Sequence, residues 1–264
     1  MGAGEDADHD GLADGCELAL ARAFAPELVV DRGDCLWTET APAARLAGGY
    51  LFAAAPAGAG VRLAYLPAYF RDCGWRGPVC LIARGDCGAH AGDSEFILVD
   101  VAPDTSVGTR RWRTTGVFLS AHCLSRAGKH CRWYRDRALD VFAWADDRPL
   151  GAPRVWVARG KHAHYPSARA CDRGHWAYDT CDRNRERVRF PVASAGQNAG
   201  SRWRPLLGPA GCVAARALPL GAAGTDPEAV ECVWDPSRPF RGWQADQAGP
   251  PPTPYARVLE VVGL

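Results

Sequence analysis

Acidic residues recur at a fixed spacing near the start of the chain. They occupy positions 1, 3, 5, 9 and 12 of a twelve-residue stretch, with glycine at position 6: Asp6, Asp8, Asp10, Gly11, Asp14 and Glu17. Ca²⁺ takes about six to eight oxygen ligands, and this spacing wraps carboxylates around one ion while the glycine allows a sharp turn. We therefore predict that the five acidic residues bind calcium. A solvated acidic segment without an ion is the alternative interpretation.

The same loop resembles EF-hand-like loops and, in its Asp-Gly-Leu-x-Asp run, the calcium repeats of thrombospondin type 3. The residues after it predict a helix over Glu17–Ala25, because Leu20, Ala21 and Phe24 form one apolar face at helical spacing. The resemblance implies a structural ion that caps this helix and fixes the N-terminal segment on the rest of the protein.

A second set of metal-ligating residue types lies further along the chain. Asp72 ends a strand-like run, and His90, Asp93 and Glu95 form an H-x-x-D-x-E pattern that leads into another run. On a strand, Asp93 and Glu95 share one face, and His90 in the preceding turn can fold back over them. One imidazole with three carboxylates suits Ca²⁺, Mg²⁺ or Mn²⁺ better than structural zinc. We predict a second divalent metal here; a polar network at a strand edge is the alternative.

This pattern resembles the metal cavity of the necrosis- and ethylene-inducing peptide-like proteins, whose corresponding run is Gly-His-Arg-His-Asp-Trp-Glu. The first histidine of that run matches His90 and its two acids match Asp93 and Glu95, whereas the other four positions differ. The resemblance implies that these residues and Asp72 line a metal cavity that binds a glycan or lipid headgroup. It also implies that neighbouring loops make peripheral contact with a membrane.

Three short elements, in the same order along the chain, resemble the vacuolar protein sorting-associated protein 62 family. They are an Ala-Pro-x-Leu start within residues 20–31, a Gly-Asp-x-Glu element at 92–95, and a Gly-x-His-Ala-x-Tyr-Pro element at 160–166. This resemblance spans about residues 20–166. It implies a β-sandwich core with peripheral helices and long loops.

A pair of histidines follows the strand-like run Arg154–Ala158. His162 and His164 point the same way if the strand continues, and histidine suits proton transfer near neutral pH. We predict that both are catalytic; alternatively they form a separate ion or ligand site with nearby aspartates, or one of them is a buried hydrogen-bonding residue. Four further residues are predicted to bind a ligand: His122, Asp172, Asp179 and Asp182.

Cysteine usage indicates an oxidising compartment. The chain has 11 cysteines, several of them close in sequence, and lacks the C-x₂₋₄-C pairs that zinc prefers. We predict the disulfides Cys123–Cys131 and Cys171–Cys181, and the odd count leaves one thiol or an intermolecular bridge. Together with the calcium loop, this predicts a secreted or periplasmic protein. No signal peptide is visible, and we expect a leader to have been removed.

Composition and patterning define the class of fold. The 264 residues carry a net charge of +1, so no global field favours nucleic acid and no such partner is expected. No apolar run reaches the length of about 18 residues that a membrane-spanning helix needs. Short strand-like runs between turn residues predict a mainly β protein: a β-sandwich core with peripheral helices and long disulfide-pinned loops. The runs are Val61–Phe70, Glu95–Val101, Gly116–Ala121, Arg154–Ala158, Arg187–Val192 and Ala256–Val262.

We divide the chain into an appendage of calcium loop and helix, residues 1–30, and a single β-sandwich domain, residues 31–264. The leading functional hypothesis is an exported calcium-binding protein whose divalent-metal cavity binds a polar headgroup or glycan, with membrane activity like that of a cytolysin. The first alternative is a metal-dependent hydrolase of a phosphoester, in which the metal activates water and His162 or His164 moves protons. The second alternative is a structural calcium-binding protein without catalysis.

Overall fold

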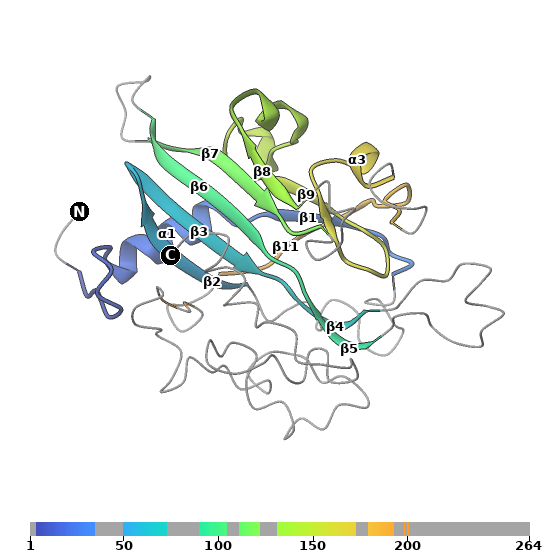
Figure 1. The fold of residues 1–264 in the computed structure, drawn as a ribbon, viewed down its shortest axis with the longest axis horizontal. Coiled ribbons are helices and arrows are strands. Elements are labelled where there is room, and N and C mark those ends of the chain that lie inside the picture. The colour runs from blue at the N-terminus through green and yellow to red at the C-terminus, as the bar shows by residue number, and fades with distance from the viewer. Residues whose placement is uncertain are drawn as a thin grey trace.

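Two β-sheets pack against each other in the computed structural model, which makes the protein mainly β (Figure 1). The structure describes residues 4–34, 50–72, 90–104, 111–121, 131–172, 179–192, 198 and 200, with the backbone alone for residues 51, 68–72 and 90–94. The larger sheet has the antiparallel order β2-β3-β6-β7-β8. Its strands are β2 (Leu51–Ala57), β3 (Gly60–Leu66), β6 (Ile97–Asp104), β7 (Arg111–Leu119) and β8 (Arg132–Arg135).

Alternation of apolar and polar side chains explains how the larger sheet forms one half of the sandwich. In β3, Val61, Leu63 and Tyr65 are buried in the main core. Arg62, between them, lies on the opposite face and forms two hydrogen bonds with the carboxylate of Asp100 in β6. Because successive side chains of a strand point to opposite faces, Val61, Leu63 and Tyr65 share the face that meets the main core.

The smaller sheet combines strands from distant parts of the chain in the order β10-β9-β1-β11. Strand β1 (Glu27–Val30) is parallel to β9 (Arg154–Val157) and antiparallel to β11 (Glu186–Arg189). Strand β10 (His164–Tyr165) pairs with β9 as an antiparallel hairpin. Leu28 of β1 is fully buried and belongs to the same core as the strands of the larger sheet, so the two sheets share one apolar interior.

Short elements surround the sandwich. Strands β4 (Ala68–Asp72) and β5 (His90–Ser94) form a two-stranded ribbon that extends from the ends of β3 and β6 (Figure 1). The described helices are α1 (Asp14–Phe24), α3 (Ala168–Asp172) and the 3₁₀ helices η4 (Asp136–Val141) and η5 (Ala145–Asp147). Within the described segments, no helix is both long and apolar enough to cross a membrane.

Helix α1 is anchored to the sandwich along one face. Ala21 and Phe24 are buried in the core, and the hydroxyl of Tyr65 donates a hydrogen bond to the Ala21 carbonyl at 2.9 Å. Nε of Arg22 donates to the carbonyl of Val192 at 2.8 Å. The helix that follows the acidic loop is therefore tied both to β3 and to the chain after β11. The acidic loop is therefore attached to a helix that the core holds in place.

Some predicted elements begin or end elsewhere. The helix begins at Asp14 rather than at Glu17, and carboxylates in a first helical turn interact favourably with the helix dipole. The predicted run Val61–Phe70 is divided into β3 and β4 at Pro67, because proline has no N–H to donate to a sheet. The runs predicted around β7, β9 and β11 overlap these strands. The run at 256–262 lies outside the described residues.

Two other predictions about the strands are corrected by the structure. The strand expected from Glu95 begins only at Ile97, and His90 lies within β5 instead of in a turn. Residues 27–30, which the sequence analysis assigned to the appendage, form β1 in the interior of the smaller sheet. The described part of the N-terminal segment therefore contributes directly to the core.

Asn184 joins two strands of the smaller sheet, and we predict a measurable loss of stability when it is replaced. Its Nδ2 donates to the buried carbonyls of Val29 and Val157 at 2.8 Å each, where β1 and β9 end. Asn184→Ala leaves both carbonyls without this donor and is expected to lower the free energy of unfolding by about 2 kcal/mol. Thr180→Ala, which removes an exposed hydrogen bond from the same segment, is the control and should cost about 0.5 kcal/mol or less. Urea denaturation measures both, and equal losses would contradict the bridging role.

Candidate metal centre

The acidic loop before α1 folds through hydrogen bonds between its own carboxylates and its backbone. One oxygen of Asp6 accepts from the N–H of Asp10 at 3.2 Å and the other from the N–H of Gly11 at 3.1 Å. Oδ1 of Asp14 accepts from the N–H of Ala7 at 3.1 Å. Gly11 has a φ of +95°, a conformation that costs glycine little and other residues much, which explains glycine at position 6. These bonds close the loop between its own residues and the first residue of α1.

This closure brings five carboxylates together. Potential ligand atoms of Asp6, Asp8 and Asp14 all lie within 4.8 Å of one another, and the same holds for Asp8, Asp10 and Glu17. Asp8 belongs to both triplets, so the two sets describe one continuous cluster. Within the parts of the chain that the structure describes, these are the groups of three or more ligating residues that meet this distance. The five residues predicted from the spacing are the five that the fold gathers.

Burial makes the cluster costly without a cation. Asp8 and Glu17 are fully buried. Oδ1 of Asp10 accepts a hydrogen bond from the N–H of Leu12 at 2.8 Å, but its Oδ2 and the Oε1 of Glu17 are buried without a hydrogen-bond partner. Buried polar atoms are nearly always satisfied, and a buried carboxylate oxygen without a partner carries a large desolvation penalty. A cation held between these oxygens would remove that penalty.

The electrostatics of the loop agree with this interpretation. Burial, and then the nearby charges of Asp8 and Asp10, raise the pKa of Glu17 to about 8. Burial also raises the pKa of Asp10 to about 6, with further contributions from Asp8, Asp6 and Asp14. Carboxyl groups that resist ionisation near neutral pH mark a site where negative charge is concentrated and poorly compensated. A divalent cation bound here would supply the compensation.

One partner of the loop was missed by the sequence analysis. Nδ2 of Asn198 donates to Oε2 of Glu17 at 3.0 Å, across 181 positions of sequence. Asn198 is itself buried, and its backbone forms an isolated bridge with Phe52 of β2. No local pattern around Asn198 points to the loop, so only the fold reveals the contact.

The residues of the second predicted metal site lie on or beside the β4–β5 ribbon. The strand register sets Asp72 opposite His90 and places Asp93 further along the same ribbon. The side chains of these three residues lie outside the described part. Glu95 follows the ribbon, and its carboxylate accepts a hydrogen bond from the hydroxyl of Ser120. The backbone thus brings Asp72 and His90 side by side, and a metal at this place stays a prediction.

The two histidines predicted as catalytic do not lie on one continuing strand. Strand β9 ends at Val157, and the chain turns back through Gly160 and His162, whose φ angles are +76° and +52°. His164 then pairs with Val157 in the antiparallel strand β10. The condition for both rings to point the same way, a strand that continues, is therefore not met.

Both histidine rings are fully buried. Nε2 of His162 lies 3.3 Å from Oδ1 of Asp34, whose other oxygen accepts from the N–H of Gly160 at 2.7 Å. Burial lowers the pKa of His164 to about 3, although a hydrogen bond to the backbone of Phe96 acts in the opposite direction. Asp34 was not predicted as a partner, because it is distant in sequence. A catalytic role for either histidine stays a prediction.

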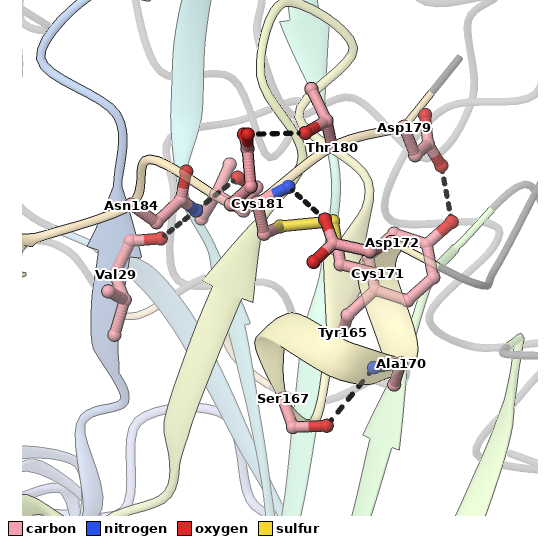
Figure 2. The surroundings of a disulfide bond; sticks show 12 residues. Val29, Tyr165, Ser167, Ala170, Cys171, Asp172, Asp179, Thr180, Cys181 and Asn184 are labelled. Carbon is pink, nitrogen blue, oxygen red and sulfur yellow. Dashed lines mark hydrogen bonds between the residues drawn. A yellow bond between two sulfur atoms is a disulfide. The ribbon is translucent and has the colours of Figure 1, made fainter. Parts of the chain in front are cut away.

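Figure 2 shows the environment of two aspartates that were predicted to bind a ligand. The predicted disulfide Cys171–Cys181 is confirmed, with a Cα–Cα distance of 5.9 Å. Oδ1 of Asp172 accepts from the N–H of Cys181 at 2.8 Å, and Asp179 accepts from the hydroxyl of Tyr165. Both carboxylates thus hold the segment around the disulfide in place. A ligand at these residues stays a prediction.

The remaining predicted residues have separate outcomes. Asp182 accepts a hydrogen bond from Oγ1 of Thr180 at 2.8 Å on the exposed side of the same segment. His122 and Cys123 lie outside the described residues. Cys131 is disulfide-bonded. Because its predicted partner Cys123 lies outside the described residues, the pairing stays a prediction.

No protein-family model, curated protein or solved structure matches this chain. The resemblances to the necrosis-inducing proteins and to the vacuolar sorting family therefore stay predictions. The function of the chain has to be argued from its own geometry, in which the acidic loop is the most complete site.

Proposed function

We propose that this chain is an exported β-sandwich protein that binds calcium through its N-terminal loop. The observation that carries the proposal is the pair of buried carboxylate oxygens, Oδ2 of Asp10 and Oε1 of Glu17, that lack a hydrogen-bond partner inside a cluster of five acids. Such an arrangement is unfavourable for the protein alone and favourable around a cation. The ion is therefore expected to be part of the folded state.

The donor set favours calcium over other divalent metals. The five clustered side chains offer oxygen atoms alone, whereas structural zinc sites use thiolate and imidazole ligands. Mg²⁺ requires a small octahedral shell and retains several waters, while Ca²⁺ accepts a larger and more flexible set of carboxylates. The turn at Gly11 and the separation of the acids along twelve residues suit the larger ion.

The proposed role of the ion is to fix the loop on the body of the protein. Glu17 ends the loop and also belongs to the first turns of α1, whose Ala21 and Phe24 are packed in the core. An ion bound by Glu17 and by Asp6 at the other end of the loop connects the start of the described chain to this helix. Export is supported by the disulfide Cys171–Cys181, because such bonds persist mainly in oxidising compartments.

A second proposal concerns the β4–β5 ribbon. Its support is the register that sets Asp72 opposite His90, two of the residue types that a divalent ion needs. With Asp93 and Glu95, these residues are proposed to hold Ca²⁺, Mg²⁺ or Mn²⁺ and, through it, a glycan or a lipid headgroup. This proposal concerns a separate place in the fold and does not depend on the N-terminal loop.

Isothermal titration of metal-stripped protein with CaCl₂ tests both proposals. Wild type is expected to bind one calcium ion in the loop with a Kd of about 1–100 µM. Asp8→Asn removes the carboxylate shared by both triplets and should weaken this binding by about 100-fold or more, since the ligand set loses a central charge. MgCl₂ should compete poorly.

The matched control is Asp140→Asn, the same chemical change at an exposed position in η4. It should leave the titration unchanged. Wild-type protein that takes up no calcium would exclude the loop proposal. The ribbon site is tested by titrations with CaCl₂, MgCl₂ and MnCl₂. A second bound ion that is absent in Asp93→Ala would support the ribbon site, and no second ion with any of the three metals would exclude it.

A further inference from the structure

Asn198 occupies an unusual place between the acidic loop and the larger sheet. Asn198 is 1% exposed. It contacts Glu17 although the two residues are 181 positions apart in the sequence. Its Nδ2 donates to Oε2 of Glu17 at 3.0 Å, and its Oδ1 accepts from the N–H of Gly200 at 2.9 Å. Its backbone bridges to Phe52 of β2. The side chain of Asn198 thus contacts the loop, while β2 helps to hold its backbone. The hydrogen bond from Gly200 fixes the orientation of its amide.

The orientation of this amide follows from its partners. The N–H of Gly200 can only donate, so the atom that faces it must be the amide oxygen. The amide nitrogen consequently faces Glu17, where a carboxylate needs a donor. The amide can make both contacts only in this orientation, and the bond to Gly200 therefore helps to hold the donor against the loop.

The contact with Asn198 gives the two carboxylate oxygens of Glu17 different environments. Oε2 is held by Asn198, while Oε1 is buried without a hydrogen-bond partner in the triplet with Asp8 and Asp10. A neutral amide donor can orient a carboxylate without neutralising it, whereas a lysine or arginine would compete with a bound cation for its charge. The arrangement presents one oxygen of Glu17 to an ion and keeps its full charge available.

We infer that Asn198 is the positioning residue of the acidic loop and that the loop ion and the docking of Asn198 and Gly200 stabilise each other. The inference rests on the proposed calcium site. If the docked Asn198 raises the affinity for calcium, calcium must tighten the docking of Asn198 by the same factor, because coupling between two equilibria is reciprocal. An ion bound near the start of the chain thereby controls how firmly a segment 181 positions later is held against β2.

The first test compares calcium affinities. Hydrogen-bonding partners of metal ligands typically change affinity by about 10- to 100-fold, so Asn198→Ala should raise the Kd for CaCl₂ by about 10-fold or more. The matched control is Asn184→Ala, which removes another buried asparagine with two hydrogen bonds, but at the end of β1 and β9. Its Kd should equal that of wild type, so a general loss of stability is separated from a loss of positioning.

The second test needs no variant and remains decisive if Asn198→Ala fails to fold. Hydrogen exchange of wild-type protein, followed at the amide of Gly200, should slow by about 10-fold when CaCl₂ is added to the metal-stripped chain. Exchange that is unchanged by bound calcium would overturn the coupling, as would a Kd of Asn198→Ala equal to that of wild type. Absence of calcium binding by wild type is a different result, because it would remove the proposed site itself.

Discussion

Calcium is expected to raise the free energy of unfolding of this protein by about 4 kcal/mol when the free ion is about a thousandfold above its Kd. The reason is that the ion binds the folded loop, where five carboxylates meet, and finds no such site in the unfolded chain. Urea denaturation in excess EDTA and in excess CaCl₂ measures this difference directly. Asp140→Asn, far from the loop in sequence and exposed, should gain as much as wild type.

Glu17→Gln separates the ion from other roles of the same side chain. In the metal-free protein the pKa of Glu17 is raised to about 8, so at pH 7 the carboxyl holds its proton and glutamine imitates it closely. Metal-free Glu17→Gln should therefore be within about 1 kcal/mol of metal-free wild type, because the acceptor for Asn198 is also retained. Calcium should stabilise the variant little, since the ligand charge is lost.

The pH dependence of the metal-free protein has a defined sign. Between the ordinary pKa of 4.5 and the folded value of about 8, the folded chain keeps a proton on Glu17 that the unfolded chain releases. The contribution of Glu17 to the free energy of unfolding must therefore fall as the pH rises through this window, and Glu17→Gln must lack this contribution. A metal-free variant much less stable than wild type at pH 7 would show that Glu17 supports the fold by another route.

Local patterns were sufficient to predict the acidic cluster, because its carboxylates lie within twelve residues and its turn needs one glycine. The same is true of Cys171–Cys181, which closes a short segment. Strand β1 was missed as part of the sandwich for the opposite reason. Leu28 and Val29 form a short run whose parallel partner in β9 lies far away in sequence, and such pairing leaves no local signature.

Long-range polar contacts are the part of the candidate sites that could not be predicted from the sequence. Asn198 meets Glu17, and Asp34 meets His162, only because the sheets bring distant segments together. The hairpin between β9 and β10 needs positive φ angles, one of them at His162. Unlike glycine, histidine in a sequence does not indicate such a turn. The spacing of His162 and His164 predicted rings on one side of a strand that continues. The backbone turns back after β9 instead, so the two residues do not lie on one strand.

Acid is expected to destabilise the protein through His164. Burial lowers the pKa of this ring to about 3, below the ordinary value of 6.5. Between these two values the unfolded chain binds a proton on His164 that the folded chain does not bind, so the contribution of His164 to the free energy of unfolding must fall as the pH falls. Over the interval from pH 6.5 to pH 4 this single group is expected to contribute about 3 kcal/mol, at about 1.4 kcal/mol per pH unit.

His164→Gln removes the titration and keeps a side-chain donor for the Phe96 backbone, which is the reason for choosing glutamine. At pH 7 the variant is expected to be less stable than wild type, because glutamine does not fill the buried space of the ring. As the pH is lowered to 4, the difference should shrink by about 3 kcal/mol, since only wild type has the buried imidazole to protonate. Denaturation curves of the two proteins in the same calcium-containing buffers isolate this effect from the loop. Parallel pH profiles would mean that the ring accepts its proton without unfolding, and that the segment from β10 to the disulfide opens to water more readily than its burial indicates.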